Sequence, residues 1–341
     1  MKKVNVAIVG ATGAVGTKIL EKLLERDFPV QSIKLLASKR SAGTEISAGG
    51  HNYIVEETVP ESFDGIDIAF FSAGGSISEK FAHEAVKRGA VVIDNTSAFR
   101  MTEQIPLVVP EVNADALNGH AGIISNPNCS TIQMVTALQP IREKLGLNRI
   151  IVSTYQAVSG AGSEAIDELE NQSNQFTKRS EIKAEILPSA SAERHYPIAF
   201  NAIPQIDSFD SSGYTLEELK MMNETKKIFG DPELSVSATC VRLPVVTGHS
   251  ESVYIEVGQD GVTVKELHDL LTNAPGVVVQ DDPSKQLYPM PLFAEGKDEV
   301  FVGRIRKDPE HPAGFHLWIV SDNLLKGAAL NSVQIAETLL N

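Results

Sequence analysis

The chain opens with VNVAIVGATGAVG at residues 4–16, and this stretch decides the fold of its first part. Residues 4–9 form a continuous apolar run apart from Asn5, which is typical of a strand buried on both faces. Glycines at 10, 13 and 16 then lead into a helix-like pattern over 15–24. Such glycines let a pyrophosphate approach the backbone N–H groups at a helix start. The G-x-x-G-x-x-G spacing differs from the standard G-x-G-x-x-G. Its place between strand and helix still favours dinucleotide binding over a purely structural turn.

Strand-like and helix-like patterns continue to alternate in the first part of the chain. Strands are predicted over 32–37, 66–71, 90–93 and 122–125, with a helix over 78–87. Alternating units form a parallel sheet with right-handed crossovers, and ligands bind beyond the carboxyl ends of its strands. We therefore expect a Rossmann-like α/β domain over 1–128, joined by a C-terminal helix over 322–341.

The pattern changes from about residue 149. Longer strands are predicted over 150–155, 235–243, 252–257, 299–305 and 315–320, with helices over 163–176, 216–229 and 264–271. This order is typical of an α+β domain with a mixed or antiparallel sheet, which we place at 129–321. Residues 175–212 are rich in Pro, Ser and Asn, and we interpret them as a long excursion without an assigned role.

Composition narrows the class of protein. The chain has 341 residues and a net charge of −14, which argues against a nucleic-acid partner because that partner needs a basic face. No apolar run is long enough to cross a membrane. Two cysteines argue against a disulfide framework and favour a reducing, cytoplasmic compartment. No Cys/His cluster has metal-ligand spacing, so no metal is expected. An anionic substrate would need specific Arg and Lys residues in its cleft.

The segment that follows the predicted second strand points to the type of dinucleotide. An NAD-binding domain usually carries an acidic residue here to hold the ribose 2′-OH. This chain has ASKRS at 37–41, where Ser38 and Arg40 offer a hydroxyl and a cation that suit a 2′-phosphate. The pattern favours NADP, with a solvated basic turn as the alternative.

Cys129 is the candidate nucleophile. It lies in SNPNCST at 125–131, where a strand-like run passes into a helix-like pattern. The unpaired N–H groups and positive end of a helix lower the pKa of a thiol from about 8.5, and they can hold an oxyanion. A thiolate together with a nicotinamide cofactor indicates chemistry at the acyl or aldehyde level.

Other polar residues have both a functional and an ordinary interpretation. His249, in a predicted turn between strands, is the candidate proton shuttle, although a lone histidine is more often structural. Gln156 ends a predicted strand before a glycine-rich turn that allows close approach of a ligand. Cys240, within a predicted strand, is interpreted as packed and inert. Four charged residues are further candidates for ligand binding, although surface exposure or ion pairing is the ordinary explanation for such residues: Arg100, Glu218, Lys220 and Arg242.

Together these segments resemble the aspartate-semialdehyde dehydrogenase family over nearly the full chain. The resemblance rests on GATGAVG (10–16), DNTSAFRM (94–101), VPEVN (109–113), SNPNCSTIQ (125–133), QAVSGAG (156–162), ELKMMNETKKI (218–228), CVRLPVVTGHS (240–250) and DNLLKGAALN (322–331). Several segments in fixed order are more specific than any one motif. ASKRSAG at 37–43 resembles the NADP-dependent bacterial branch.

The resemblance implies a role for each candidate. Cys129 would be the acyl-forming nucleophile, His249 the general acid/base, and Gln156 the residue that orients the substrate. The implied substrate ligands are Arg242 for the α-carboxylate, Glu218 for the amino group, Arg100 and Lys220 for the phosphate, and Asn128 in an assisting role. The implied contacts to NADP are Gly10, Thr12, Gly13, Ala14, Val15, Ser38, Arg40, Ser41, Ser159, Gly160 and Asn323.

The resemblance also implies an activity. This is the NADPH-dependent reductive dephosphorylation of L-aspartyl-4-phosphate to L-aspartate 4-semialdehyde through a cysteine thioester, in lysine, threonine, methionine and diaminopimelate biosynthesis. It further implies a homodimer built on the sheet of the second domain, with a tetramer left open. Two alternatives stand beside it: an N-acetyl-γ-glutamyl-phosphate reductase or related phosphorylating aldehyde dehydrogenase, and a non-catalytic dinucleotide-sensing protein. An acidic side chain that can bind a free amino group favours the aspartate-semialdehyde dehydrogenase activity, because an N-acetylated substrate would not need one.

Overall fold

The computed structural model describes residues 2–174, 181–189 and 192–341. The chain divides into two compact units: unit 1 is Met1–Asn128 with Gly327–Asn341, and unit 2 is Cys129–Lys326. The candidate nucleophile is therefore the first residue of unit 2. The return to unit 1 begins at Gly327 rather than at 322, since the last strand of unit 2 runs to Ser321 and a short π-helical turn follows it.

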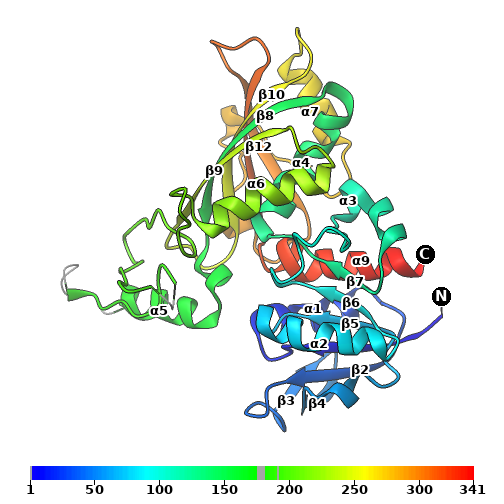
Figure 1. Ribbon diagram of the computed structural model, residues 1–341. Coiled ribbons are helices and arrows are strands. Elements are labelled where there is room, and N and C mark those ends of the chain that lie inside the picture. The colour runs from blue at the N-terminus through cyan, green and yellow to red at the C-terminus, as the bar shows by residue number, and fades with distance from the viewer. Residues whose placement is uncertain (1, 175–180, 190–191) are drawn as a thin grey trace. The chain divides into compact units, whose positions relative to one another are not determined.

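Unit 1 is built on a seven-stranded sheet in the order β3-β4-β2-β1-β5-β6-β7. Its strands are β1 (Val4–Val9), β2 (Val30–Ala37), β3 (Glu45–Ala48), β4 (His51–Glu57), β5 (Ile68–Phe71), β6 (Val91–Asp94) and β7 (Ile123–Ser125). Neighbouring strands are parallel except β3 and β4, which confirms the predicted parallel sheet (Figure 1). The strand order reverses at β1, and sheets of this kind bind ligands at such a point.

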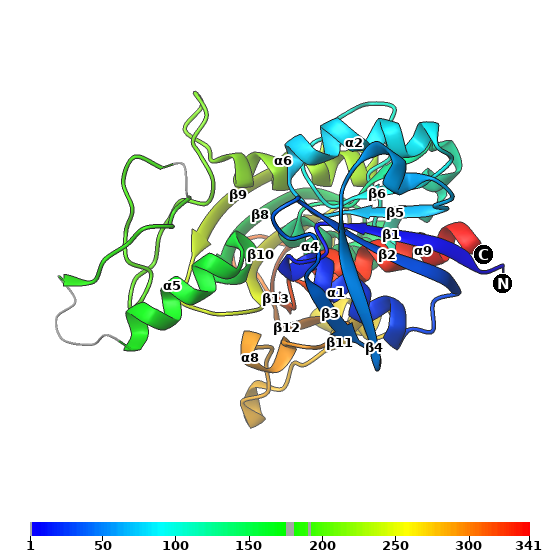
Figure 2. The ribbon, with the colours of Figure 1, turned by 90° about the horizontal axis from the view of Figure 1, so that it is seen from below.

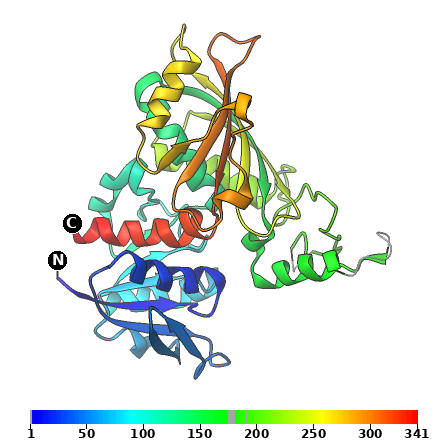
Figure 3. The same ribbon diagram turned by 180° about the vertical axis from the view of Figure 1, so that it is seen from behind.

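Helices cover both faces of this sheet. One face packs against α1 (Ala14–Glu25) and α9 (Leu330–Leu340), which lie side by side (Figure 3). The other face packs against α2 (Gly75–Lys87). Shorter helical segments complete the unit: η1 (Pro60–Phe63), α3 (Pro110–Asn113) and η2 (Ala114–Gly119). The C-terminal helix thus supplies part of the core of unit 1, as the sequence pattern predicts.

The hairpin of β3 and β4 has no counterpart among the predicted elements. Most of its residues are exposed or half-buried, and Val55 is the one that is fully buried. A hairpin at the edge of a sheet buries little surface, so its period-two apolar pattern is short, limited to Ile46 and Ala48 on β3 and to Tyr53 and Val55 on β4.

Unit 2 is built on a six-stranded mixed sheet in the order β11-β12-β13-β10-β8-β9, which confirms the predicted mixed sheet. Its strands are β8 (Leu147–Gln156), β9 (Ser235–Arg242), β10 (His249–Val257), β11 (Val277–Val279), β12 (Val300–Lys307) and β13 (Gly314–Ser321). Strand β10 is antiparallel to both β8 and β13, whereas β8 and β9 are parallel.

Three helices pack on this sheet: α4 (Cys129–Leu145), α6 (Leu216–Phe229) and α7 (Val264–Thr272). They contact one another through α4, so they share one face of the sheet (Figure 1). The shorter elements of the unit are η3 (Val158–Ala161), α5 (Ser163–Asn174), η5 (Pro283–Lys285), α8 (Pro291–Ala294) and η6 (Leu325–Ala329). The side chains that α4 and α6 direct toward the sheet therefore lie on the same face of it.

The long excursion after α5 has little regular structure over 181–189 and 192–212 (Figure 2). Residues 175–180 and 190–191 of the predicted excursion lie outside the described residues. The described part packs on α5 and η3 through a small apolar cluster: Val158, Ala165, Leu169, Leu187, Ile198, Ala199 and Ile203.

Candidate active site

Cys129 is the first residue of α4, the position that the sequence predicts for it. The residue is half-buried and its thiol is free of any disulfide. The helix runs for 17 residues, so the N–H groups at its start carry a partial positive charge. These groups can stabilise a thiolate and, after its attack on a carbonyl, the resulting oxyanion.

Arg242, Gln156 and His249 lie at the same end of three adjacent strands. Arg242 ends β9 and is the register partner of Gln156, which ends β8, whereas His249 begins β10. Their side chains are buried, with 3%, 1% and 0% of the residue exposed, respectively. The peptide of Ala157 joins two of them: its N–H donates to His249 Nδ1 (3.1 Å) and its carbonyl accepts from Arg242 Nη1 (2.6 Å).

The bond to Nδ1 determines the tautomer of His249. Since Nδ1 accepts a hydrogen bond, the neutral ring carries its proton on Nε2. Burial, and after it the Arg242 guanidinium, lowers the pKa of His249 from 6.5 to about 3, so the ring is neutral at pH 7. Nε2 has no hydrogen-bond partner in the described part of the chain. This N–H is therefore available to a ligand.

The prediction that His249 lies in a turn is wrong. Pairing of β10 with β13 extends the strand back to His249, whose register partner is Ser321. Gln133 on α4 joins both ends of this pair, because its amide donates to the His249 carbonyl and its oxygen accepts from the Ser321 hydroxyl. The imidazole is thus carried by a strand rather than by a mobile loop.

Arg242 is a buried cation beside the imidazole. Burial lowers the pKa of its guanidinium, and the Glu217 carboxylate and Cys129 thiol nearby oppose that shift. A charge this far from water is stable only with an anionic partner or ligand. Gly160 lies against both groups, since a Cβ there would be 3.1 Å from Arg242 Nη1 and 3.3 Å from His249 Nε2. The backbone of η3 therefore leaves room beside the free N–H.

The structure does not place Glu218 among these side chains. Its Oε2 accepts from the N–H of Thr215 (2.7 Å), and its Oε1 accepts from the N–H of Cys240 (2.9 Å). Glu218 is the third residue of α6 and completes a capping box with Thr215. The expectation that Glu218 contacts a substrate amino group is thus at odds with its geometry. The T-x-x-E pattern at 215–218 is a sequence signal for this cap and could have excluded Glu218.

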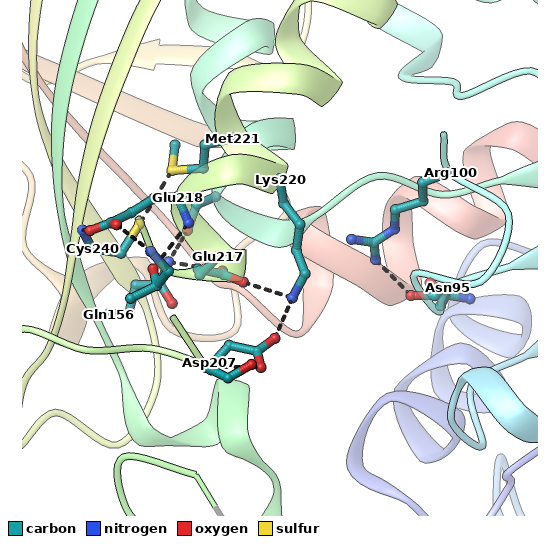
Figure 4. A network of polar contacts seen from close by, with 12 residues as sticks. Asn95, Arg100, Gln156, Asp207, Glu217, Glu218, Lys220, Met221 and Cys240 are labelled. Atoms are coloured by element: carbon teal, nitrogen blue, oxygen red, sulfur yellow. Dashed lines mark hydrogen bonds and ion pairs between the residues drawn. The ribbon is translucent and has the colours of Figure 1, made fainter. Parts of the chain in front are cut away.

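Glu217, the neighbour of Glu218 on α6, points toward Gln156 and Lys220 (Figure 4). Its Oε1 accepts from Gln156 Nε2 (3.1 Å), and the same amide nitrogen donates to the hydroxyl of Ser130 (2.7 Å), the neighbour of Cys129. Glu217 is 6% exposed and also lies close enough to Arg242 to oppose the fall of its pKa. Sequence reasoning missed Glu217 because adjacent residues on a helix point in different directions.

Lys220 lies one turn after Glu217 on α6. Its Nζ is 3.3 Å from Glu217 Oε2 and 3.0 Å from Asp207 Oδ2. The lysine side chain is 25% exposed, so it reaches from the buried groups toward solvent. We refer to the connected residues as the polar cluster: Cys129, Ser130, Gln156, Glu217, Lys220, Arg242 and His249.

Cys240 lies beneath this row on β9 and is fully buried. Burial raises the pKa of the Cys240 thiol far above its ordinary value, and the nearby Glu217 adds to the shift. The interpretation of Cys240 as packed and inert agrees with this placement.

The glycine loop of unit 1, residues 10–16, presents bare backbone. Gly10 has φ of +86°, and a Cβ on Gly16 would lie 2.2 Å from the Gly10 carbonyl oxygen, so neither position accepts a side chain. Helix α1 begins just after Gly13, which provides no side-chain cap. Uncapped N–H groups at a helix start suit a pyrophosphate. The loop candidates lie here: Gly10, Thr12, Gly13, Ala14 and Val15.

Ser38 and Arg40 are exposed in the turn after β2, and Ser41 in the same turn is half-buried. Strands β1 and β2 are parallel neighbours, so this turn and the glycine loop lie at the same edge of the sheet. A ligand at the loop can therefore extend to the turn.

Two further candidates of unit 1 are buried: Arg100 is 8% exposed and Asn128 is 6% exposed. The guanidinium of Arg100 donates to the Asn95 carbonyl (2.8 Å; Figure 4). Asp94, at the end of β6, accepts a hydrogen bond from the hydroxyl of Ser78 on α2 (2.7 Å) and so fixes the start of the segment that leads to Arg100. Burial raises the pKa of Asp94.

Ser159 and Asn323 hydrogen-bond to each other in unit 2. Asn323 Nδ2 donates to the Ser159 hydroxyl (3.0 Å), and Asn323 Oδ1 accepts from the N–H of Gly248 (2.9 Å). These contacts fix η3 next to the start of β10. Ser159 is 3% exposed and Asn323 is 2% exposed, so their side chains are engaged in positioning the backbone.

Residues 2–174, 181–189 and 192–341 contain no group of three or more His, Cys, Asp or Glu side chains that could hold a metal ion. Across the same described ranges, every helix is too short or too polar to cross a bilayer.

Known proteins resemble this chain in sequence and in fold. Residues 5–120 match the family model "Semialdehyde dehydrogenase, NAD binding domain", and residues 138–326 match "Semialdehyde dehydrogenase, dimerisation domain". Aspartate-semialdehyde dehydrogenase of Bacillus subtilis is 64% identical over 335 residues, which cover 98% of this chain and 97% of that protein.

Solved structures extend the comparison. Aspartate semialdehyde dehydrogenase II of Vibrio cholerae, described as complexed with ASA, superposes with a TM-score of 0.92 at 46% identity, covering 100% of this chain and 99% of the other. The Candida albicans enzyme with NADP superposes with a TM-score of 0.76 at 26% identity, covering 99% of each chain. On these matches over nearly its whole length, the chain belongs to the aspartate-semialdehyde dehydrogenase family.

Proposed function

We propose that the chain converts L-aspartyl-4-phosphate, NADPH and a proton into L-aspartate 4-semialdehyde, NADP and inorganic phosphate. The observation that carries this proposal is the polar cluster. A thiol that forms no disulfide lies at a helix start, in one network with a neutral imidazole, a buried guanidinium and a buried carboxylate.

Cys129 forms the covalent intermediate. Its sulfur bonds to the acyl carbon of the substrate as the bond from that carbon to the phosphate oxygen breaks, which leaves a thioester and releases phosphate. A nicotinamide cofactor, when bound, would supply the hydride that reduces the thioester carbon. The oxygen of the resulting thiohemiacetal receives hydrogen bonds from N–H groups at the start of α4.

His249 acts on that oxygen as a hydrogen-bond donor. The Nε2–H of the neutral ring donates to the developing oxyanion and keeps its proton, and the oxyanion re-forms the aldehyde carbonyl as the carbon–sulfur bond breaks and the thiolate leaves. The proton consumed in the overall reaction leaves on the released phosphate. The Nδ1 bond from Ala157 makes His249 a donor in its resting state, so we do not assign it the role of removing the thiol proton.

Charged residues hold the ends of the substrate. Arg242 pairs with the α-carboxylate, and Glu217, in place of Glu218, accepts from the ammonium group. Gln156 orients the substrate beside the thiol, because its amide is fixed by Ser130 and Glu217. Lys220 and Arg100 bind the phosphate, with Asn128 assisting.

NADP fits the residues of unit 1. The pyrophosphate would lie on the uncapped start of α1 at Gly10, Gly13 and Ala14, and the 2′-phosphate on Ser38, Arg40 and Ser41. The absence of an acidic side chain at 38–41 supports NADP over NAD. Thr12, Val15, Ser159, Gly160 and Asn323 complete the proposed contacts. The side chains of Ser159 and Asn323 already bind each other, so we assign the backbone of η3 the contact.

We further propose that units 1 and 2 act as the NADP-binding domain and the catalytic and dimerisation domain. The protein would act as a homodimer, with a tetramer as a larger assembly, in the cytoplasm, where a thiol at position 129 stays reduced. Its product would feed lysine, threonine, methionine and diaminopimelate biosynthesis.

The test is an assay with L-aspartate 4-semialdehyde, inorganic phosphate and NADP, monitored by the absorbance of reduced nicotinamide. We expect reduction of NADP that requires both the aldehyde and phosphate. The control substrate is N-acetyl-L-glutamate 5-semialdehyde, which lacks a free ammonium group for Glu217. Preference for the control substrate would refute the proposed substrate, and cofactor binding without turnover of either would refute the enzyme assignment.

A further inference from the structure

Lys220 does not point into the cluster as an isolated cation. Two carboxylates flank its Nζ, Glu217 Oε2 at 3.3 Å and Asp207 Oδ2 at 3.0 Å (Figure 4). The two differ in burial, since the side chain of Glu217 is 8% exposed and that of Asp207 is 38% exposed. Glu217 is also held by Gln156, whereas Asp207 meets Lys220 from the loop that precedes α6.

The backbone fixes Asp207 in this position. Its φ is +70°, a left-handed conformation that Asp and Asn adopt more readily than most residues. Its second carboxylate oxygen accepts from the N–H of Ser208 (2.8 Å), and its carbonyl accepts from Gln205 (3.1 Å). A strained residue held by local hydrogen bonds is typical of functional loops. Asp207 therefore reaches Lys220 from a defined loop conformation.

The charges of the substrate explain why this carboxylate matters. On the proposed function, Arg242 takes the α-carboxylate and Glu217 takes the ammonium group, which leaves Lys220 for the phosphate. A phosphate dianion brings two negative charges to a lysine that Asp207 already neutralises. The ion pair between Lys220 and Asp207 is only partly buried and is therefore weak, so a dianion can displace Asp207.

We propose that Asp207 is a positioning residue that pairs with Lys220 until a phosphate group displaces it, and so weakens phosphate binding. The inference rests on the proposed function, and it concerns phosphate both as the free ion and as the acyl phosphate. Before phosphate binds, Asp207 holds the Lys220 ammonium group in place. Its negative charge then repels the phosphate dianion that approaches Lys220. Its presence also favours release of phosphate after the thioester has formed.

The experiment compares Asp207→Asn with the wild-type enzyme at fixed ionic strength. Asn keeps the left-handed conformation and the oxygen that binds Ser208, so the loop is preserved. We expect KM for inorganic phosphate to fall about fivefold, or about 1 kcal/mol, while KM for the aldehyde changes less than twofold. KM for the acyl phosphate in the opposite direction should fall similarly.

The matched control is Asp210→Asn. Asp210 lies on the same loop but binds Ser212 within its own turn and does not contact Lys220. A double-mutant cycle adds Lys220→Gln. If Asp207 acts through Lys220, Asp207→Asn should have no further effect on KM for phosphate in the Lys220→Gln background.

The outcomes separate this inference from the proposed function. Phosphate-dependent turnover by the wild type tests the function, and the ratio of the two KM values in the variant tests Asp207. An unchanged or higher KM for phosphate would overturn the inference, as would an equal shift in Asp210→Asn or an effect that persists without Lys220. A shift in both KM values together with a lower Tm would assign Asp207 a structural role instead.

Discussion

The glycine loop of unit 1 and the polar cluster of unit 2 bind their ligands by opposite means. The loop is one contiguous stretch, residues 10–16, and it acts by lacking side chains at Gly10 and Gly16. The cluster draws on α4, α6 and the ends of three strands, and it acts through side chains that are mostly buried. A site made of backbone is specified by local spacing, whereas a site made of side chains depends on strand register and helix ends.

Removing the nucleophile should produce the largest difference between the two regions, because it abolishes chemistry in the polar cluster and leaves the glycine loop unchanged. Cys129→Ala should lower turnover by at least about 10⁴-fold, because no other side chain of the cluster can form the thioester. Binding of NADPH, followed by its fluorescence, should change little, since the glycine loop is untouched. Wild-type turnover in Cys129→Ala would remove the mechanism, and loss of NADPH binding would show that the two regions are not independent.

The reverse experiment alters the loop. Gly16→Ala places a Cβ 2.2 Å from the Gly10 carbonyl oxygen and should destabilise unit 1 by about 3 kcal/mol, with loss of NADPH binding. Gly13→Ala is the matched control, since its Cβ would lie 3.4 Å from the same oxygen. The control should keep its Tm within a few degrees. Equal destabilisation by both substitutions, measured by urea unfolding, would contradict the argument from close approach.

Glu217 and Glu218 provide the sharpest test inside the cluster. Glu217→Gln removes the proposed ammonium ligand and should raise KM for the aldehyde about 100-fold, or about 2.7 kcal/mol. Glu218→Gln instead weakens two hydrogen bonds to backbone N–H groups and should lower stability by about 1–2 kcal/mol. Its KM should move far less. If Glu218→Gln produced the larger rise in KM, the assignment from geometry would be wrong.

Glu217 and Glu218 also show how much of the site can be predicted from the sequence. The parallel sheet, the loop, α6 and the thiol at a helix start follow from local patterns that involve neighbouring residues. Which of two adjacent glutamates enters the cluster depends on where α6 is capped and how it packs on β9. His249 was expected in a turn because its pairing with Ser321 spans 72 residues of sequence (321 minus 249). The edge hairpin β3–β4 carries only a short apolar alternation, at Ile46 and Ala48 and at Tyr53 and Val55.

A smaller effect is expected at the turn beside the glycine loop. Arg40→Ala should raise KM for NADPH about tenfold and leave KM for NADH nearly unchanged, because only NADPH carries the 2′-phosphate. Lys39→Ala is the control, since Lys39 is an exposed cation in the same turn. An unchanged preference for NADPH over NADH in Arg40→Ala would show that Arg40 does not contact the 2′-phosphate.

The pH dependence of stability distinguishes the regions in another way, because residues 10–16 contain no ionisable side chain. In the cluster, burial lowers the pKa of His249 from 6.5 to about 3. The unfolded chain therefore binds a proton that the folded chain does not between pH 6.5 and 3, and stability falls as the pH is lowered through this window. His249→Asn should remove up to about 1.4 kcal/mol of that loss per pH unit.

Glu251 lies two residues later on β10, and its effect on the pH dependence of stability has the opposite sign. It is fully buried, with 0% of the residue exposed, and neither carboxylate oxygen has a hydrogen-bond partner among the described residues. Burial raises the pKa of Glu251 well above its ordinary value, so the folded chain holds a proton that the unfolded chain loses above pH 4.5. Its contribution to stability is complete below pH 4.5 and is lost as the pH rises.

Glu251→Gln should therefore be more stable than the wild type at pH 8 and gain nothing at pH 4. Urea unfolding at both values measures this difference, and His249→Asn provides the comparison because its gain should appear only on the acid side. Parallel slopes for the two variants would contradict the burial of one of these groups. Opposite slopes would show that a single strand holds, two residues apart, an imidazole whose pKa is lowered and a carboxyl group whose pKa is raised by burial.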